Sequence, residues 1–327
     1  MASPYAIKTL IRRTFGQRFA LARLSRYPVI GRWMDRLLFE NDDIMYLPPN
    51  NAIPVNHRLP AREDLAVPSQ VLEHFIHQAR YHWVMDFCIC RDASHCQSYP
   101  VDLGCLFMGE AARDINPKFG RRVTPEDAIA HTRRCREQGL VHLIGRNKLD
   151  SVWLNAGPAH KLLTVCNCCP CCCLWKILPE ISPVISGKLT RMPGISLHVT
   201  EACVGCGTCT RDVCFVEAIH MEDGRARIGP ECRGCGRCVT VCPSQAIELR
   251  IEDDAFIETT IRRIAAAVEV AEARRRSKKD ADGRYQVVRG PEPVHVALAG
   301  AEAAPESNRG PCIGVMDGDG GARPLDP

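Results

Sequence analysis

The apolar residues in the first 40 positions recur at helical intervals, and arginine fills many of the polar positions between them. The spacing of Ile7, Leu10, Ile11 and Phe15 is typical of a helix that buries one face. The other face of such a helix would be strongly basic. We therefore predict a basic helical segment over residues 1–60 that packs on its own domain, with a membrane surface or an acidic partner as the alternative contact for its basic face.

Residues 61–190 alternate between helical and strand-like patterns, which predicts a mixed α/β domain. The expected elements are helices over 68–83 and 124–139 and strands over 140–144 and 162–165. Thr124 and Pro125 favour a helix start, because a threonine hydroxyl caps free N–H groups and proline suits the first helical position. Gly139 favours the end of that helix. These elements would hold the cysteine-rich segments beside them in defined positions.

The C-terminal pattern predicts one helix and then no regular structure. An apolar stripe that includes Phe256 and Ile264 predicts a helix over residues 253–277, in a C-terminal helical segment of 253–279. Residues 280–327 are rich in glycine, proline and acidic side chains and lack periodicity, so we expect a disordered tail. Cys312 stands alone in this tail and is expected to be a free thiol.

Cysteine is the residue that changes this picture, with 20 in a chain of 327 residues. A loop with three cysteines, each separated by two residues, occurs twice and is followed each time by a fourth cysteine. The first copy is Cys203, Cys206, Cys209 and Cys214, and the second is Cys232, Cys235, Cys238 and Cys242. Glycines within both loops permit sharp turns, and thiolates at this spacing suit iron–sulfur cubanes. Structural zinc is the alternative, but a zinc site rarely needs two such triplets.

Residues 196–252 resemble the bacterial two-[4Fe-4S] ferredoxin domain. The resemblance rests on the eight cysteines, the loop glycines and an Ala-Ile pair that follows each copy. It implies a pseudo-twofold module in which the fourth cysteine of each copy binds the other cluster. The implied ligands are Cys203, Cys206, Cys209 and Cys242 for one cluster and Cys232, Cys235, Cys238 and Cys214 for the other. The first copy departs from the family pattern, with an extra residue before Cys214 and Phe215 where proline is usual.

Ten of the eleven cysteines that precede the repeat are candidates for an additional metal site. They are Cys88, Cys90, Cys96, Cys105, Cys166, Cys168, Cys169, Cys171, Cys172 and Cys173. The first four could form a tetrathiolate site alone, or the two groups could meet and share a centre. A subset is expected to bind, because neighbouring side chains diverge. Another iron–sulfur cluster is the favoured content, with zinc, thiol chemistry or inert packing as alternatives. The segment also looks like a group of uncharacterised cysteine-rich ferredoxin-like proteins, which implies iron–sulfur binding and nothing more.

Several residues near these cysteines carry smaller hypotheses. Cys135 lies in a predicted helix and is expected to be a buried small hydrophobe. Arg91 either balances cluster charge or is a solvated surface residue. His95 is expected to donate a hydrogen bond rather than to bind metal. Arg233 and Arg237 flank the second cluster loop and would raise its potential relative to the first.

Together these features predict an α+β protein with a ferredoxin-like dicluster module after a cysteine-rich domain. The expected division is 1–60, 61–190, 191–252, 253–279 and 280–327. We expect an electron-transfer protein with two [4Fe-4S] clusters that relays electrons between a donor and a redox partner protein or an additional N-terminal metal centre. The alternative is an oxidoreductase that reduces its substrate at an N-terminal cysteine-ligated cluster. No catalytic residue is assigned. The absence of a signal peptide, of a membrane-spanning run and of a nucleic-acid-binding motif predicts a cytoplasmic protein without a nucleic-acid partner.

Overall fold

The computed structural model describes residues 4–50, 68–271, 278–279 and 285–286, which all lie within one compact unit. Its helices include α1(Pro4–Thr14), α2(Arg18–Leu24), α3(Pro28–Met34), α4(Ser69–Gln78), α5(Ile89–Ala93), α6(Pro125–Glu137), α7(Lys148–Leu154), α8(Pro183–Ser186), α9(Arg237–Val241) and α10(Phe256–Ala267). Short 3-10 or π turns are η1(Phe15–Gln17), η2(Asp35–Phe39), η4(Glu110–Asp114), η5(Ala159–Lys161), η6(Leu174–Ile177) and η7(Thr208–Thr210). The prediction of a mixed α and β chain is confirmed.

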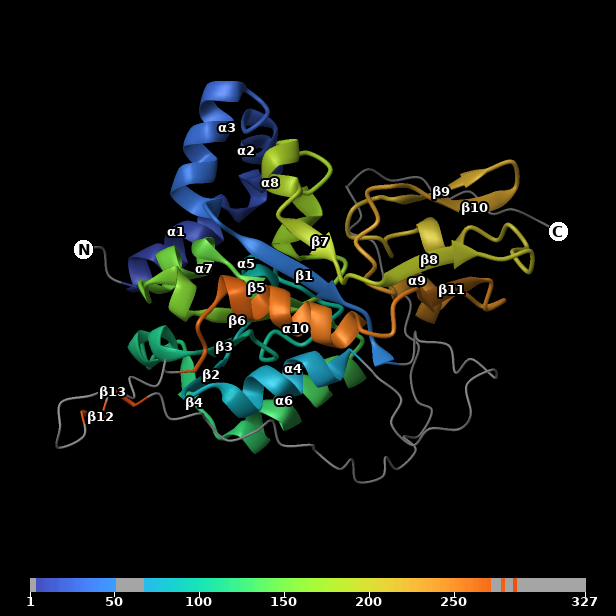
Figure 1. The fold of residues 1–327 in the computed structure, drawn as a ribbon. Helices are drawn as coiled ribbons and strands as arrows, with labels where there is room; N and C mark the ends of the chain where they lie inside the picture. Colours follow the sequence, from blue (N-terminus) through green and yellow to red (C-terminus); the bar gives the residue numbers. More distant parts are fainter. Residues whose placement is uncertain (1–3, 51–67, 272–277, 280–284, 287–327) are drawn as a thin grey trace. The chain divides into compact units, whose positions relative to one another are not determined.

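A seven-stranded sheet forms the centre of this unit (Figure 1). Its strands, in spatial order, are β4(Gly120–Arg122), β2(His82–Met85), β3(Leu106–Met108), β6(Leu163–Cys168), β5(Val141–Arg146), β1(Asp43–Leu47) and β7(Leu189–Arg191). Neighbouring strands are antiparallel except β1 and β7, which are parallel. The strands predicted over 140–144 and 162–165 are therefore present as β5 and β6, each slightly longer than the apolar run predicted.

The two faces of the sheet have different cores. Helices α4, α6 and α10 cover one face, where residues such as Phe75 pack on Val165 and Ile144. Because side chains alternate along a strand, Cys166 and Cys168 lie on the opposite face of β6 from Val165. There they join a second buried cluster that includes Tyr46. The sheet thus places two cysteine side chains on one face.

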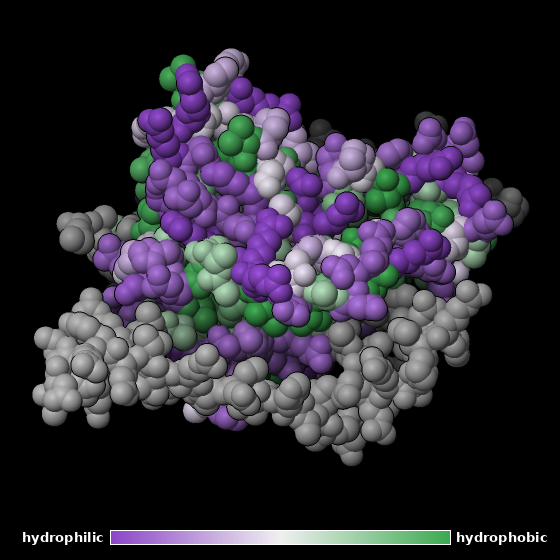
Figure 2. Space-filling view, in the orientation of Figure 1, coloured by the Kyte–Doolittle hydropathy of each residue, from purple (hydrophilic) through white to green (hydrophobic). Residues whose placement is uncertain are grey.

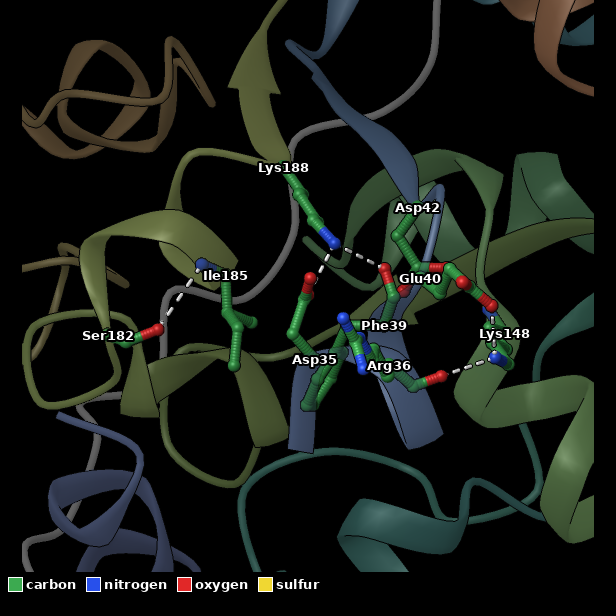
Figure 3. Close-up of polar contacts among 9 residues, drawn as sticks. All are labelled: Asp35, Arg36, Phe39, Glu40, Asp42, Lys148, Ser182, Ile185 and Lys188. Atoms are coloured by element: carbon green, nitrogen blue, oxygen red, sulfur yellow. Dashed lines mark hydrogen bonds and ion pairs between the residues drawn. The ribbon is translucent and has the colours of Figure 1, made fainter. Parts of the chain in front are cut away.

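The N-terminal helical segment packs on this domain, as predicted. Lys188 bonds to the carboxylate of Asp35 and donates a 2.7 Å hydrogen bond to the Phe39 carbonyl (Figure 3). Lys148 pairs with Glu40 at 2.9 Å, and its backbone N–H donates to Asp42 at 2.7 Å. These bonds tie the end of the helical segment to the β7 and α7 regions.

Two predicted boundaries were wrong. The helix expected over 68–83 ends at Gln78, because Ala79 adopts an extended backbone and residues 82–85 pair as β2 with β3 and β4. The helix expected over 253–277 spans only Phe256 to Ala267, because Val268 returns to extended backbone. The predicted tail over 280–327, including Cys312, lies outside the described residues except for β13(Tyr285–Gln286), which pairs with β12(Lys278–Lys279).

The repeated cysteine motifs lie in a smaller β region that follows the sheet. Strand β8(Ile195–Val199) pairs with β11(Ile247–Ile251), and β9(Ile219–Glu222) forms a hairpin with β10(Arg225–Ile228). The first motif lies between β8 and β9, and the second leads into α9 and β11. Among the described helices, none combines the length and apolarity needed to span a membrane.

Candidate metal centres

The first candidate centre is a small pocket lined by four cysteines of the repeat. They are Cys203, Cys206, Cys209 and Cys242. The backbone N–H of Ala246 donates to the Cys242 sulfur at 3.3 Å, and that of Ala226 donates to the Cys203 sulfur at 3.5 Å. Gly205 has a φ of +72°, and a Cβ there would lie 2.3 Å from the Gly224 carbonyl oxygen. Only glycine fits this point of the loop.

The other four cysteines of the repeat line a second pocket, together with Tyr46 and Phe215. They are Cys214, Cys232, Cys235 and Cys238. Backbone N–H groups again point at sulfur, from Ala218 to Cys214 at 3.3 Å and from Gly234 to Cys232 at 3.4 Å. Burial raises the pKa of the Cys235 thiol to about 12. A thiol with this pKa is protonated at neutral pH unless a cation binds its thiolate.

Four of the upstream cysteines form a compact group. The sulfur atoms of Cys96, Cys169, Cys171 and Cys172 all lie within 4.8 Å of one another, and no other group of three or more ligating side chains in the described residues is as compact. The Cys96 and Cys171 sulfurs are 3.7 Å apart, and those of Cys171 and Cys172 are 3.6 Å apart. Cys96 follows α5, and the other three lie in the turn after β6.

The remaining six upstream cysteines line a cavity of about 260 Å³. They are Cys88, Cys90, Cys105, Cys166, Cys168 and Cys173, and Cys169 also contributes to the wall. Hydrogen bonds from Cys105 and then Cys168 hold the pKa of Cys166 well below its usual value, while the bond to Cys166 raises that of Cys105. Such thiols share protons, so they hold negative charge without all being ionised. The α1 and η1 residues Ile11 and Phe15 close part of the cavity.

Arg91 is the buried cation of this region, with 0% of its surface exposed. It donates a 2.8 Å hydrogen bond to the Asn167 carbonyl and a second bond to the Leu103 carbonyl. Although burial opposes it, the nearby thiolates, Cys88 first and then Cys169, raise the pKa of Arg91 further. The solvated-surface interpretation of this residue was wrong, because α5 turns the side chain inward beneath the thiols.

One comparison with known protein families finds a match in the repeat region. A family model described as a 4Fe-4S binding domain matches residues 230–248. The chain contains a 4Fe-4S ferredoxin-type domain. Over 49 residues it is 45% identical to a subunit of the ion-translocating oxidoreductase complex of Methanosarcina acetivorans, a match that covers 15% of this chain and 18% of the relative. The chain thus matches less than a fifth of the relative's length. No solved structure matches the chain.

Eight of the cysteines named from sequence line the two pockets of the repeat, and the structure divides the other ten between the compact group and the cavity. Cys135 is fully buried in α6, as predicted. His95 is exposed. Two cavity residues escaped the sequence reasoning, Arg18 and Asp150. Asp150 lies in the first turn of α7, where a carboxylate commonly stabilises the positive end of the helix dipole, so its sequence position does not indicate a role in the cavity.

Proposed function

We propose that the chain is an iron–sulfur electron-transfer protein in which the ferredoxin-type domain carries two [4Fe-4S] clusters. The observation that carries the proposal is the separation of the eight cysteines into two pockets, each with three thiols from one motif and the fourth from the other. This is the crossed arrangement of two-cluster ferredoxins. The ligands would be Cys203, Cys206, Cys209 and Cys242 in one pocket and Cys232, Cys235, Cys238 and Cys214 in the other.

The chain's own groups fit anionic clusters. Bound cubanes supply one-electron redox chemistry at potentials that the protein tunes. Equivalent backbone N–H groups of the two copies, those of Ala218 and Ala246, each donate to the fourth cysteine sulfur at 3.3 Å. Hydrogen bonds to sulfur stabilise negative charge and so favour the reduced state. Two copies of one geometry support two clusters of one kind.

A relay toward the N-terminal cysteines is the second part of the proposal. Tyr46 is fully buried, lines the pocket of Cys232 and Cys235, and belongs to the same apolar cluster as Cys168 and Cys173 of the cavity. Its ring centroid lies 5.8 Å from that of Phe215. A continuous packed region therefore joins a ferredoxin pocket to the upstream thiols, and we propose that electrons pass between an N-terminal centre and the ferredoxin clusters through it.

Metal and sulfide counts on anaerobically purified protein, with EPR of the dithionite-reduced form, test the two-cluster proposal. The octet should hold about eight irons, since each cubane holds about four. Cys235→Ser should remove about four irons and one reduced-cluster signal, and Cys206→Ser should do the same for the other pocket. A single set of about four irons in the eight repeat cysteines, lost completely on either substitution, would overturn the two-cluster proposal. Cys135→Ala, at a buried cysteine outside both pockets, is the control and should leave the counts unchanged.

The cavity favours a second candidate function, substrate reduction at the N-terminal cysteines. Asp150 lines the cavity, and its carboxyl accepts 2.8 Å and 2.7 Å hydrogen bonds from Trp153 and Asn147. Burial raises the pKa of Asp150 well above its usual value, so the group could hold a proton beside the thiols. Asp150→Asn would then abolish turnover of a small oxidised substrate while leaving metal content unchanged. Equal turnover by both proteins would exclude this role for Asp150.

The N-terminal helices carry a surface suited to an anionic membrane, which we propose as a contact site. Val29 and Trp33 are 72% and 65% exposed on α3, beside the exposed arginines Arg32 and Arg36. Figure 2 shows hydrophobic atoms among hydrophilic ones at this end of the molecule. Exposed aromatic and aliphatic groups with arginine suit a lipid interface. Sedimentation with phosphatidylserine vesicles should exceed that with phosphatidylcholine and fall in Trp33→Ser. Equal sedimentation with both vesicle types would refute it.

A further inference from the structure

We infer that the ten upstream cysteines form two centres of different kinds: a single tetrahedral zinc ion held by Cys96, Cys169, Cys171 and Cys172, and a polynuclear iron–sulfur cluster in the cavity of the other six. This inference deepens the proposed function, because it names the N-terminal centre to which the ferredoxin clusters would relay electrons. The zinc site would be structural, and the cavity cluster would be the redox centre. The two parts rest on different observations.

Sulfur spacing carries the zinc assignment. Four thiolates around one ion at a Zn–S distance of about 2.3 Å lie about 3.8 Å apart in a tetrahedron. The measured separations of 3.7 Å and 3.6 Å in the compact group match this geometry. Ligands of a cubane bind different irons at its corners and must lie farther apart. In both ferredoxin pockets no three thiols lie within 4.8 Å of one another, so the same structure contains both spacings.

The surroundings of the compact group also suit a structural ion. Its thiols pack against Leu103, Leu140 and Cys135 in a small apolar cluster, and Cys169 and Cys172 are buried. Four protein thiolates leave no open position, which is the mark of a structural rather than a catalytic zinc site. The bound ion would tie the loop after α5 to the turn after β6.

The cavity cannot be explained by a single ion. Six thiols line this cavity of about 260 Å³, two more than a single tetrahedral ion can bind. A single tetrahedral ion takes four thiolates in direct contact around it. Soft thiolates that surround a large space suit an iron–sulfur cluster. Six ligands exceed the four of one cubane, so the cluster is either a cubane with two spare thiols or a larger assembly.

Charge supports the same assignment. Thiolates and inorganic sulfide make a bound cluster anionic, and a buried anion needs a partner. Arg91 is fully buried and lines the cavity, and Arg18 also lines it, with its guanidinium 4.4 Å from the centroid of the Phe15 ring. Two cations that line one cavity favour an anionic occupant, because partly protonated thiols alone supply less negative charge than a bound cluster with its sulfides.

The test is an element count on the anaerobically purified full-length protein and on three variants. The wild type should contain one zinc and at least about four irons beyond the eight of the ferredoxin-type domain. Cys96→Ser should lose the zinc and keep the iron. Cys105→Ser/Cys166→Ser should lose the additional iron and keep the zinc. Cys135→Ala, in the same apolar cluster as the compact group but outside its ligands, should keep both.

A measurement on the wild type keeps the inference testable if a variant does not fold. X-ray absorption at the zinc edge should show four sulfur neighbours at about 2.3 Å. Absence of zinc, or loss of iron in Cys96→Ser, would overturn the zinc assignment. A wild-type count of eight irons would overturn the cavity cluster while leaving the two ferredoxin clusters intact. A Cys235→Ser protein that loses about four irons but keeps its zinc would show that the zinc site does not depend on the ferredoxin clusters.

Discussion

Replacement of Arg91 is the sharpest test of how the chain holds its upstream thiols. Methionine at this position preserves much of the side-chain volume but removes the charge and both donors. The carbonyls of Asn167 and Leu103 would lose their buried partners, and the thiolates near Cys88 would lose their counter-ion. A hydrogen bond to a charged group contributes about 1.5–3 kcal/mol, so two bonds amount to about 3–6 kcal/mol. Breaking a buried ion pair costs about 3–5 kcal/mol, which agrees.

We therefore expect Arg91→Met to lower the free energy of unfolding by about 3–5 kcal/mol in anaerobic urea titrations followed by circular dichroism. Arg91→Lys should recover part of this loss, because it restores the charge but not the two-pronged geometry. Arg91→Met should also lower the midpoint potential of an N-terminal cluster, since a nearby cation stabilises the reduced state, whereas Arg91→Lys keeps the charge and should lower it less. EPR-monitored redox titration measures that shift.

The matched control is Arg121→Met. Arg121 pairs with Asp86, but 59% of its side chain is exposed, and exposed ion pairs contribute about 0–1 kcal/mol. Arg91→Met and Arg121→Met proteins with equal unfolding free energies would refute the charge-compensation argument. So would an Arg91→Lys protein no more stable than Arg91→Met, because the charge would then contribute nothing.

Three further predictions concern single groups. Burial raises the pKa of Asp42 to about 7, although a hydrogen bond from the Lys148 backbone N–H opposes the shift. The folded state therefore binds the Asp42 proton more tightly than the unfolded state does. The free energy of unfolding should fall by on the order of 4 kcal/mol as the pH rises from about 4 to 7. Asp42→Asn should flatten this dependence in urea titrations at pH 5 and 8, and parallel curves would contradict the assignment. Gly205 and Gly224 both have a left-handed φ, of +72° and +73°. A Cβ at Gly205 would lie 2.3 Å from the Gly224 carbonyl oxygen, whereas a Cβ at Gly224 would meet no atom within 4 Å. Gly224→Ala should cost about 1 kcal/mol, whereas Gly205→Ala should also reduce iron content. Arg233→Val/Arg237→Thr should lower one ferredoxin midpoint in redox titration, and unchanged midpoints would show that these arginines do not tune the cluster.

The sequence predicted the elements whose periodicity is local and missed the contacts that depend on tertiary packing. The strand that ends in Cys166 and Cys168 could be predicted because its apolar run is continuous. The end of the helix expected over 68–83 could not be predicted, because the short run of residues 82–85 is compatible with either a helix or a strand. Pairing with β3 and β4 makes it a strand. Long, strongly periodic segments are read from local pattern, and short apolar runs are not.

The candidate sites follow the same division. The proposed ferredoxin ligands could be named from sequence because each loop supplies three of them within seven residues. The upstream candidate cysteines could be listed from sequence but not divided into groups, because the Cys96 and Cys171 sulfurs meet only in the folded chain, across 75 residues of sequence. Arg91 was ambiguous for a related reason. An arginine beside a cysteine is equally compatible with solvent and with burial until the direction of its short helix is known.

The guanidinium of Arg237 connects the compact thiol group to the ferredoxin-type domain. It donates at 2.7 Å to the Tyr99 hydroxyl and at 2.9 Å to the Gly139 carbonyl, while its own residue lies between Cys235 and Cys238. Tyr99 packs against the apolar cluster that contains Cys169 and Cys172. If an ion holds that group together, it also fixes the surface on which the second cluster loop rests. A site with no redox chemistry of its own would then set the geometry of electron transfer, because transfer between centres depends on how firmly their supporting segments are held.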